Sequence, residues 1–341
     1  MDGKSARYAQ AEGPCRLDVH LDPSDHPEVR DLEVSKPASV RGLMDMWRQG
    51  GGFTAKKLAV ASDLLYKMVT DRDEKVILSF PAALMATGTR GVLRDLVKHK
   101  LVDAVITTCG TLDHDMARLW EPYLAGSFEM DDRELHRAGV NRLGNVLVPN
   151  SSYGEVLEAK LRPLLEEWYQ TGQKHWSTRE LCARLGEWAG REGNREESLL
   201  YWAHRNDIPV FVPGPTDGSV GAQVWMTYQK HRDLRFDLLK DEQDLSDFVF
   251  SAKRLGSLMI GGGISKHHVI WWSQFRDGLD TVVYLTSAPE WDGSLSGARV
   301  REAVSWGKVK EEATWETVEG DASVLLPLLV ADLFERLSPR R

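Results

Sequence analysis

Apolar residues recur at helical spacing near the start of the chain and gather into short extended runs further along it. From residue 40 to about residue 70 they lie three or four positions apart, which predicts helix, and the glycines at 50–52 divide this stretch into two helices. Residues 1–39 are rich in aspartate, proline and charge. They predict an extended N-terminal arm with little core of its own.

Short β-rich runs bounded by turn residues follow. They cover residues 76–78, 104–108, 208–212, 258–260 and 281–285. Helical patterns, such as those at 89–99 and 266–275, separate most of these runs. Strands that alternate with helices predict a mostly parallel sheet with helices on both faces, and such sheets bind ligands beyond the carboxyl ends of their strands.

Between about residue 150 and residue 206 the β-rich runs stop and helical patterns take over. Ser152 with Glu155, and Ser177 with Glu180, have the spacing of a capping box, in which a serine and a glutamate cap the first turn of a helix. We expect a single α/β domain over residues 40–337, with a helical insertion at about 150–206.

Composition narrows the class of protein. The 341 residues are 42% hydrophobic with a net charge of −8, which allows a large core and excludes global disorder. A pI near 5.7 argues against nucleic-acid binding. No apolar run reaches the ~20 residues of a membrane helix, and the first residues lack a signal-peptide core, so a cytoplasmic protein with no membrane partner is expected. Three distant cysteines and the lack of HExxH predict no metal site.

Glycine and small polar residues follow several predicted strands. The turn Gly261–Gly263 lies between an apolar run and a helical pattern, where backbone can approach a phosphate. Its spacing matches neither GxGxxG nor GxxxxGK[ST], so a tight turn without a ligand is equally compatible. The segments 107–110 and 216–219 suit a nucleotide crevice, but they also suit ordinary loops.

The stretch 287–308 is polar and rich in glycine, and it ends in a predicted short helix at 300–306 with Lys308 just beyond it. Helical spacing puts Glu302 and Trp306 on one face. An apolar wall such as Trp306 would lower the pKa of Lys308, and an unprotonated lysine can form a Schiff base while Glu302 moves protons or holds a cation. The alternative is a solvated lysine that favours the helix dipole. Of the adjacent His267 and His268, at most one can face the crevice.

Several segments together resemble deoxyhypusine synthase. They are GGGISKHHVIWW (261–272), DGSLSGARVREAVSWGK (292–308) and GDASVLLPLLVA (320–331), with TTCGTLDHD (107–115) and PTDGSVG (215–221) in addition. The similarity runs from about residue 36 to residue 337. The segments TLDHD and KHHVIWW resemble those of the archaeal and bacterial branch of the family. The resemblance implies a sirtuin-like Rossmann variant that uses NAD and works as a homotetramer with active sites shared between subunits.

The implied activity is NAD-dependent transfer of the 4-aminobutyl group of spermidine to one lysine of the translation initiation factor 5A precursor. It passes through a covalent lysine imine and releases 1,3-diaminopropane, with no net redox change because NADH reduces the final imine. One alternative is an aminobutyltransferase of the homospermidine-synthase type, which acts on a free diamine. Another is an NAD-binding regulatory protein without turnover.

The resemblance also implies roles for individual residues. Its catalytic residues would be Lys308 as nucleophile, with His267 and Glu302. Polyamine binding would involve Trp306, Tyr284, Asp113, His114, Gly293, Ser294 and Leu295. NAD binding would involve Ala82, Ala83, Ala86, Thr108, Cys109, Gly110, Asp217, Gly262, Ser287, Ala288, Asp292, Asp321 and Ala322.

Four positions depart from the eukaryotic branch of that family. Ala222 and Leu295 stand where the eukaryotic branch has aspartate, Trp271 stands in place of asparagine, and His114 stands in place of glutamate. The first three belong to the implied polyamine pocket. Asp113 and Asp115 are the nearest candidates for the missing anions.

Overall fold

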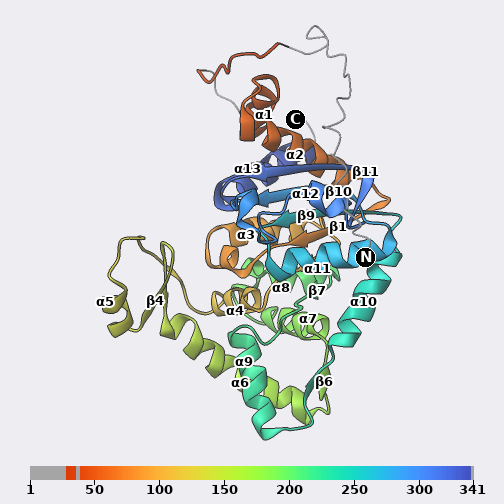
Figure 1. Ribbon diagram of the computed structural model, residues 1–341. Coiled ribbons are helices and arrows are strands. Elements are labelled where there is room, and N and C mark those ends of the chain that lie inside the picture. Colours follow the sequence, from red (N-terminus) through yellow and green to blue (C-terminus); the bar gives the residue numbers. More distant parts are fainter. Residues whose placement is uncertain (1–27, 36–38, 339–341) are drawn as a thin grey trace, which may run out of the picture.

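A six-stranded sheet lies at the centre of the protein, whose computed structural model describes residues 28–35 and 39–338 (Figure 1). Every neighbouring pair in this sheet is parallel. The strands, in spatial order, are β11 (Val309–Glu319), β10 (Leu279–Thr286), β9 (Arg254–Ile260), β1 (Glu74–Ser79), β2 (Ala104–Ile106) and β7 (Val210–Phe211).

The strand order has one reversal. From β1 the chain proceeds through β2 to β7 at one edge, then returns to β9 beside β1 and proceeds through β10 to β11 at the other edge. This is the order of doubly wound dinucleotide-binding sheets, in which ligands bind at the point of reversal. The five predicted strands and the mostly parallel sheet are confirmed, whereas β11 was not predicted.

Helices cover both faces of the sheet because its strand residues alternate between two hydrophobic clusters. Leu78 and Leu258 face one cluster, and Ile77 and Met259 face the other. The first face is covered by α2 (Phe53–Thr70), α3 (Thr89–Lys98) and α13 (Ala322–Leu337). The second face is covered by α10 (Leu238–Phe250), α11 (Gly263–Ser273) and α12 (Val300–Val304).

The predicted N-terminal helices are confirmed. They are α1 (Val40–Gln49) and α2, and Gly50–Gly52 separate them. Most of the predicted arm at 1–39 lies outside the described residues. Its described part, residues 28–35, contains no helix or strand and is exposed.

The helices expected at about 150–206 are α6 (Gly154–Gln170), α7 (Thr178–Ala189) and α8 (Leu199–Asn206). Their apolar faces join the same cluster as the sheet, so they do not form a separate core. The capping box of Ser177 and Glu180 is confirmed at the start of α7. The one expected at Ser152 is wrong, because α6 begins at Gly154 with Tyr153 as its N-cap and without a side-chain cap.

The remaining elements are short or lie away from the sheet. A hairpin arm projects from the body of the molecule and was not predicted (Figure 1). It consists of β3 (Leu124–Ala125), α5 (Asp132–Arg137), β4 (Val140–Leu143) and β5 (Val146–Pro149). The others are α4 (Cys109–Ala117), α9 (Ser219–Lys230), β6 (His175–Trp176), β8 (Arg235–Phe236) and the 3₁₀ turns η2 (Ala82–Ala86), η3 (Asn150–Ser152), η4 (Arg195–Glu197), η5 (Gln274–Arg276) and η6 (Glu290–Asp292).

Membrane-spanning helices and metal-binding clusters are both absent from the described residues. None of their helices combines the length and apolar character that crossing a bilayer requires. Within residues 28–35 and 39–338, no group of three or more histidine, cysteine or acidic side chains is arranged to hold a metal ion.

Candidate functional site

The residues that the resemblance assigns to NAD follow the carboxyl ends of the central strands. Those of η2 follow β1, Thr108 to Gly110 follow β2, and Gly262 follows β9. The others follow β7, β10 and β11. The loops are tied together here, since the amide of Ala82 donates to the Thr108 hydroxyl at 3.1 Å. The fold therefore gathers these residues along one edge of the sheet.

Cys109 is the most chemically distinctive side chain at this edge. It is fully buried, and its thiol donates to the carbonyl of Pro215 at 3.1 Å. Burial, assisted by the charge of Asp113, raises the pKa of this thiol to about 12. The thiol therefore stays protonated near neutral pH and packs as a small apolar group rather than acting as a nucleophile.

Two helices begin at this edge without a side-chain cap. They are α4, which starts at Cys109, and α11, which starts at Gly263. A side chain at Gly263 would meet no atom within 4 Å, so the space beside this helix start is open. Amide groups at a helix N-terminus attract anions, so the edge suits the phosphates of a dinucleotide.

Gly262 shows how closely the backbone approaches here. A Cβ atom at this position would lie 2.6 Å from both Cα and N of Ser296. We expect Gly262→Ala to reduce the free energy of unfolding by about 1–3 kcal/mol, because two backbone segments would have to separate. Gly88→Ala is the matched control, since a Cβ there meets nothing within 4 Å at an ordinary helical φ of −64°. Equal denaturation midpoints for the two variants would show that the contact at Gly262 is unimportant.

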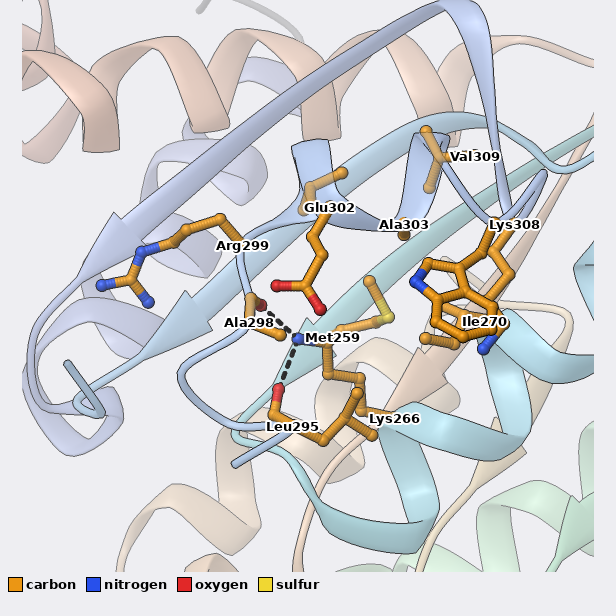
Figure 2. A pocket seen from close by; sticks show the side chains of 12 residues that line it. Met259, Lys266, Ile270, Leu295, Ala298, Arg299, Glu302, Ala303, Lys308 and Val309 are labelled. Atoms are coloured by element: carbon orange, nitrogen blue, oxygen red, sulfur yellow. Dashed lines mark hydrogen bonds between the residues drawn. The ribbon is translucent and has the colours of Figure 1, made fainter. Parts of the chain in front are cut away.

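A cavity of about 160 Å³ opens on the sheet face covered by α11 and α12 (Figure 2). Side chains from β9, from these two helices and from the start of β11 form its wall. The lining residues are Met259, Lys266, Ile270, Leu295, Ala298, Arg299, Val300, Glu302, Ala303, Trp306, Lys308 and Val309. The structure thus brings together four of the predicted site residues, Leu295, Glu302, Trp306 and Lys308.

Lys308 immediately precedes β11, and backbone hydrogen bonds fix its position. Its amide donates to the carbonyl of Ala303 at 3.0 Å, and its carbonyl accepts from the amide of Leu279 at 3.1 Å. The residue is only 9% exposed. Its Nζ lies 5.1 Å from the ring centre of Trp306 and 6.0 Å from that of Trp271. The predicted aromatic neighbour is present, although Trp306 itself is 66% exposed.

The two adjacent histidines have separate environments, as expected from their spacing on a helix. His267 stacks on Trp271, with ring centres 5.8 Å apart. Burial and the nearby charge of Lys308 lower its pKa, which favours the neutral ring. His268 faces the other way and lies 3.4 Å from a carboxylate oxygen of Glu242. Of the two histidines, His267 is the one whose pKa is affected by the charge of Lys308.

Lys266 is a pocket residue that the sequence reasoning missed. It is 3% exposed, and its Nζ donates to the carbonyls of Leu295 at 2.8 Å and Ala298 at 2.7 Å. Burial lowers its pKa to about 7, against the opposing effect of Glu302. A signal was available, because Lys266 shares helical spacing with Ile270 and Ser273 and so belongs to the buried face of α11.

Asp113 and His114 lie in α4, apart from the Lys308 cavity, and neither lines it. The carboxylate of Asp113 is fully buried and accepts hydrogen bonds from the amides of Ser219 and Val220 and from the hydroxyl of Tyr153. His114 pairs with Tyr123 at 2.9 Å, and burial lowers its pKa to about 4. Within one chain, Asp113 caps the start of α9, and His114 contacts Tyr123 next to the hairpin arm. The contact of either residue with a polyamine stays a prediction.

Asp115 also has partners within the fold. Its buried carboxylate accepts from Arg90, from the hydroxyl of Ser198 and from the amides of Leu199 and Leu200 at the start of α8. These contacts occupy both oxygens. Asp115 is therefore no replacement for a pocket anion in the described chain.

The fold and the site together are those of an α/β protein with a dinucleotide-binding type of sheet and a separate pocket that contains amines. The sheet has the strand order of dinucleotide-binding α/β proteins, uncapped helix starts lie at its carboxyl edge, and a separate pocket holds two lysines and a glutamate. Comparison with known proteins then identifies the family. The deoxyhypusine synthase family model matches residues 42–333, and the chain belongs to the deoxyhypusine synthase family.

Individual relatives agree with this membership. The chain is 52% identical to a "Probable deoxyhypusine synthase" of Picrophilus torridus and 51% identical to one of Thermoplasma acidophilum. Each alignment covers 89% of this chain and 96% of the relative. A crystal structure from Entamoeba histolytica, described provisionally as a deoxyhypusine synthase, matches with a TM-score of 0.63 at 20% identity, covering 90% of this chain and 97% of that one. This last likeness concerns the fold alone.

Proposed function

We propose that the chain forms deoxyhypusine by transferring the 4-aminobutyl group of spermidine to a lysine of the translation initiation factor 5A precursor. Membership of the deoxyhypusine synthase family supports this transferase activity. The observation that carries the proposal in the structure is that Lys308, Glu302 and Trp306 line one pocket. An amine and a carboxylate in one pocket are what imine exchange on an amine substrate requires.

NAD fits the carboxyl edge of the sheet, and when bound it supplies hydride transfer to and from carbon. The residues that would hold it are the predicted ones after the strands, with the helix starts at Cys109 and Gly263 facing its phosphates. We further propose that the fold is the sirtuin-like variant of this architecture and that residues 40–337 form one catalytic domain.

The residues of the pocket would act in sequence. The amine of Lys308 attacks the imine carbon of the oxidised donor, forms its own imine to the aminobutyl carbon and expels 1,3-diaminopropane. Glu302 holds the donor's ammonium, and His267, being neutral, can take the proton that Lys308 must lose. The amine of the acceptor lysine then displaces Lys308 by the same exchange, which regenerates the free enzyme amine.

We also propose that each active site is completed by a second copy of the chain, as in a homotetramer. In β10, Leu279 adjoins Lys308 whereas Thr286 adjoins the predicted NAD residue Ser287. Seven residue steps of strand separate the two ends by about 23 Å, at about 3.3 Å per residue, which is more than a lysine side chain spans. The exposed aromatic rings of Trp271, Phe275 and Trp306 supply apolar surface for such a contact.

The function is tested by labelling. The protein is incubated with NAD and spermidine labelled in its aminobutyl part, together with either the factor 5A precursor or putrescine. We expect label on one lysine of the precursor. Label found only on putrescine would instead support the homospermidine-synthase type. Label on neither acceptor, with NAD bound, would support a regulatory protein.

A further inference from the structure

One wall of the Lys308 pocket is a loop segment whose backbone carbonyls all have hydrogen-bond donors. This segment is Ser294–Ala298. The carbonyl of Ser294 accepts from amides within the segment, that of Ser296 accepts from Tyr284 and Thr286, and that of Gly297 accepts from Arg299. The two remaining carbonyls, of Leu295 and Ala298, accept from the Nζ of Lys266.

Lys266 therefore joins two separate parts of the chain. It lies on the buried face of α11, about thirty residues before the segment, and its Nζ lies between the carbonyls of Leu295 and Ala298 (Figure 2). The ring of Tyr284 lies beneath this ammonium, 3.7 Å from Nζ, and adds a cation–π contact. The hydroxyl of Tyr284 donates to the same segment at 2.6 Å.

The segment Ser294–Ala298 leads directly into α12. Ala298 is followed by Arg299 and then by α12, which carries Glu302. The segment is also packed against the glycine turn, because Gly262 faces the backbone of Ser296. Its conformation thus affects both the predicted cofactor edge and the position of Glu302.

We infer that Lys266 is a positioning residue, which holds the segment Ser294–Ala298 in the shape that forms the pocket wall and directs Glu302 toward the substrate. For its effect on turnover, the inference rests on the proposed function. For its effect on the loop, it rests only on the contacts of Lys266. Without an amine at this position, the carbonyls of Leu295 and Ala298 lose their donors, and leaving buried acceptors unpaired is costly.

The charge of Lys266 adds a second effect. Glu302 and Arg299 are the charged groups nearest to it, and Tyr284, His267 and Lys308 surround them. When Lys266 is protonated it attracts Glu302 and competes with a substrate ammonium for that carboxylate. Because its pKa is about 7, this competition weakens as the pH rises from 6 to 8. The pKa of His267 is also lowered, by burial and by the charge of Lys308.

The test uses three variants of the full chain. Lys266→Met removes both donors and the charge, Lys266→Gln keeps two N–H donors without a charge, and Lys253→Met changes an exposed lysine that pairs with Asp73 on the surface. Amide hydrogen exchange in residues 294–298 is measured without substrates, and kcat and KM for spermidine are measured from pH 6 to pH 8.

We expect Lys266→Met to raise exchange in this segment at least about tenfold and to lower kcat/KM by about 10- to 30-fold, the effect of two ordinary hydrogen bonds. Lys266→Gln should restore part of the protection from exchange and part of kcat/KM. Lys253→Met should match the wild type in both. The wild-type KM should fall between pH 6 and pH 8, and this fall should be absent in both Lys266 variants.

Each result has a separate meaning. Unchanged exchange in Lys266→Met would overturn the inference, whatever the activity. Increased exchange with an unchanged kcat/KM and pH profile would overturn the role in positioning Glu302. If the wild type transfers no aminobutyl group while exchange rises in Lys266→Met, the proposed function fails and the hold on the loop stands.

Discussion

Lys308→Ala should abolish aminobutyl transfer while it leaves NAD binding nearly unchanged. The variant removes the amine that carries the group between donor and acceptor, and no other lining residue lies in its position between Trp306 and Trp271. Loss of a covalent nucleophile typically costs about 10⁴-fold or more in rate. Transfer is measured with labelled spermidine, and NAD binding is measured by calorimetry.

Lys253→Ala is the matched control, because this lysine forms an exposed surface pair with Asp73 and does not line the pocket. It should retain wild-type transfer. If Lys308→Ala lost NAD binding together with transfer, the lysine would have a structural role, and the proposed covalent step would lack its residue.

Asp115→Ala should cause the largest loss of stability. The carboxylate is fully buried, forms an ion pair with Arg90 at 3.0 Å and caps the start of α8. Removing it leaves the guanidinium of Arg90 buried without its partner, and breaking such a pair typically costs about 3–5 kcal/mol. The free energy of unfolding, obtained from urea denaturation, should fall by about this amount.

Asp73→Asn provides the comparison, since Asp73 belongs to an exposed pair with Lys253, and its denaturation midpoint should stay near that of the wild type. Folded Asp115→Ala protein should keep its KM for spermidine. A stable variant with a raised KM would instead make Asp115 the pocket anion considered from the sequence.

Much of the central fold was predictable because it depends on local patterns. The five short apolar runs are the strands of a parallel sheet, which is buried on both faces and so leaves continuous apolar stretches in the sequence. The strand β11 was missed because charged or polar residues separate its apolar residues Val309, Ala313 and Trp315. An edge strand has a solvent-exposed side and so lacks the unbroken apolar run that marks the buried central strands.

The site could be predicted where its residues lie close together in the sequence. It could not be predicted where segments that are distant in the sequence meet. Glu302, Trp306 and Lys308 lie within seven residues, so one motif contained them. The role of Lys266 depends on carbonyls of Leu295 and Ala298, and backbone acceptors have no signature in a sequence. Asp113 and Asp115 looked like free anions because sequence alone cannot show that their oxygens are occupied by helix amides.

The most direct test of the covalent role of Lys308 is to trap the adduct that it forms. The protein is incubated with NAD and spermidine, reduced with borohydride and digested, and the modified lysine is located by mass spectrometry. We expect an aminobutyl group on Lys308 in the wild type and none in Lys308→Ala. An adduct on Lys266, the other amine of the same cavity, or the absence of any adduct in a protein that transfers the group to its acceptor, would contradict it.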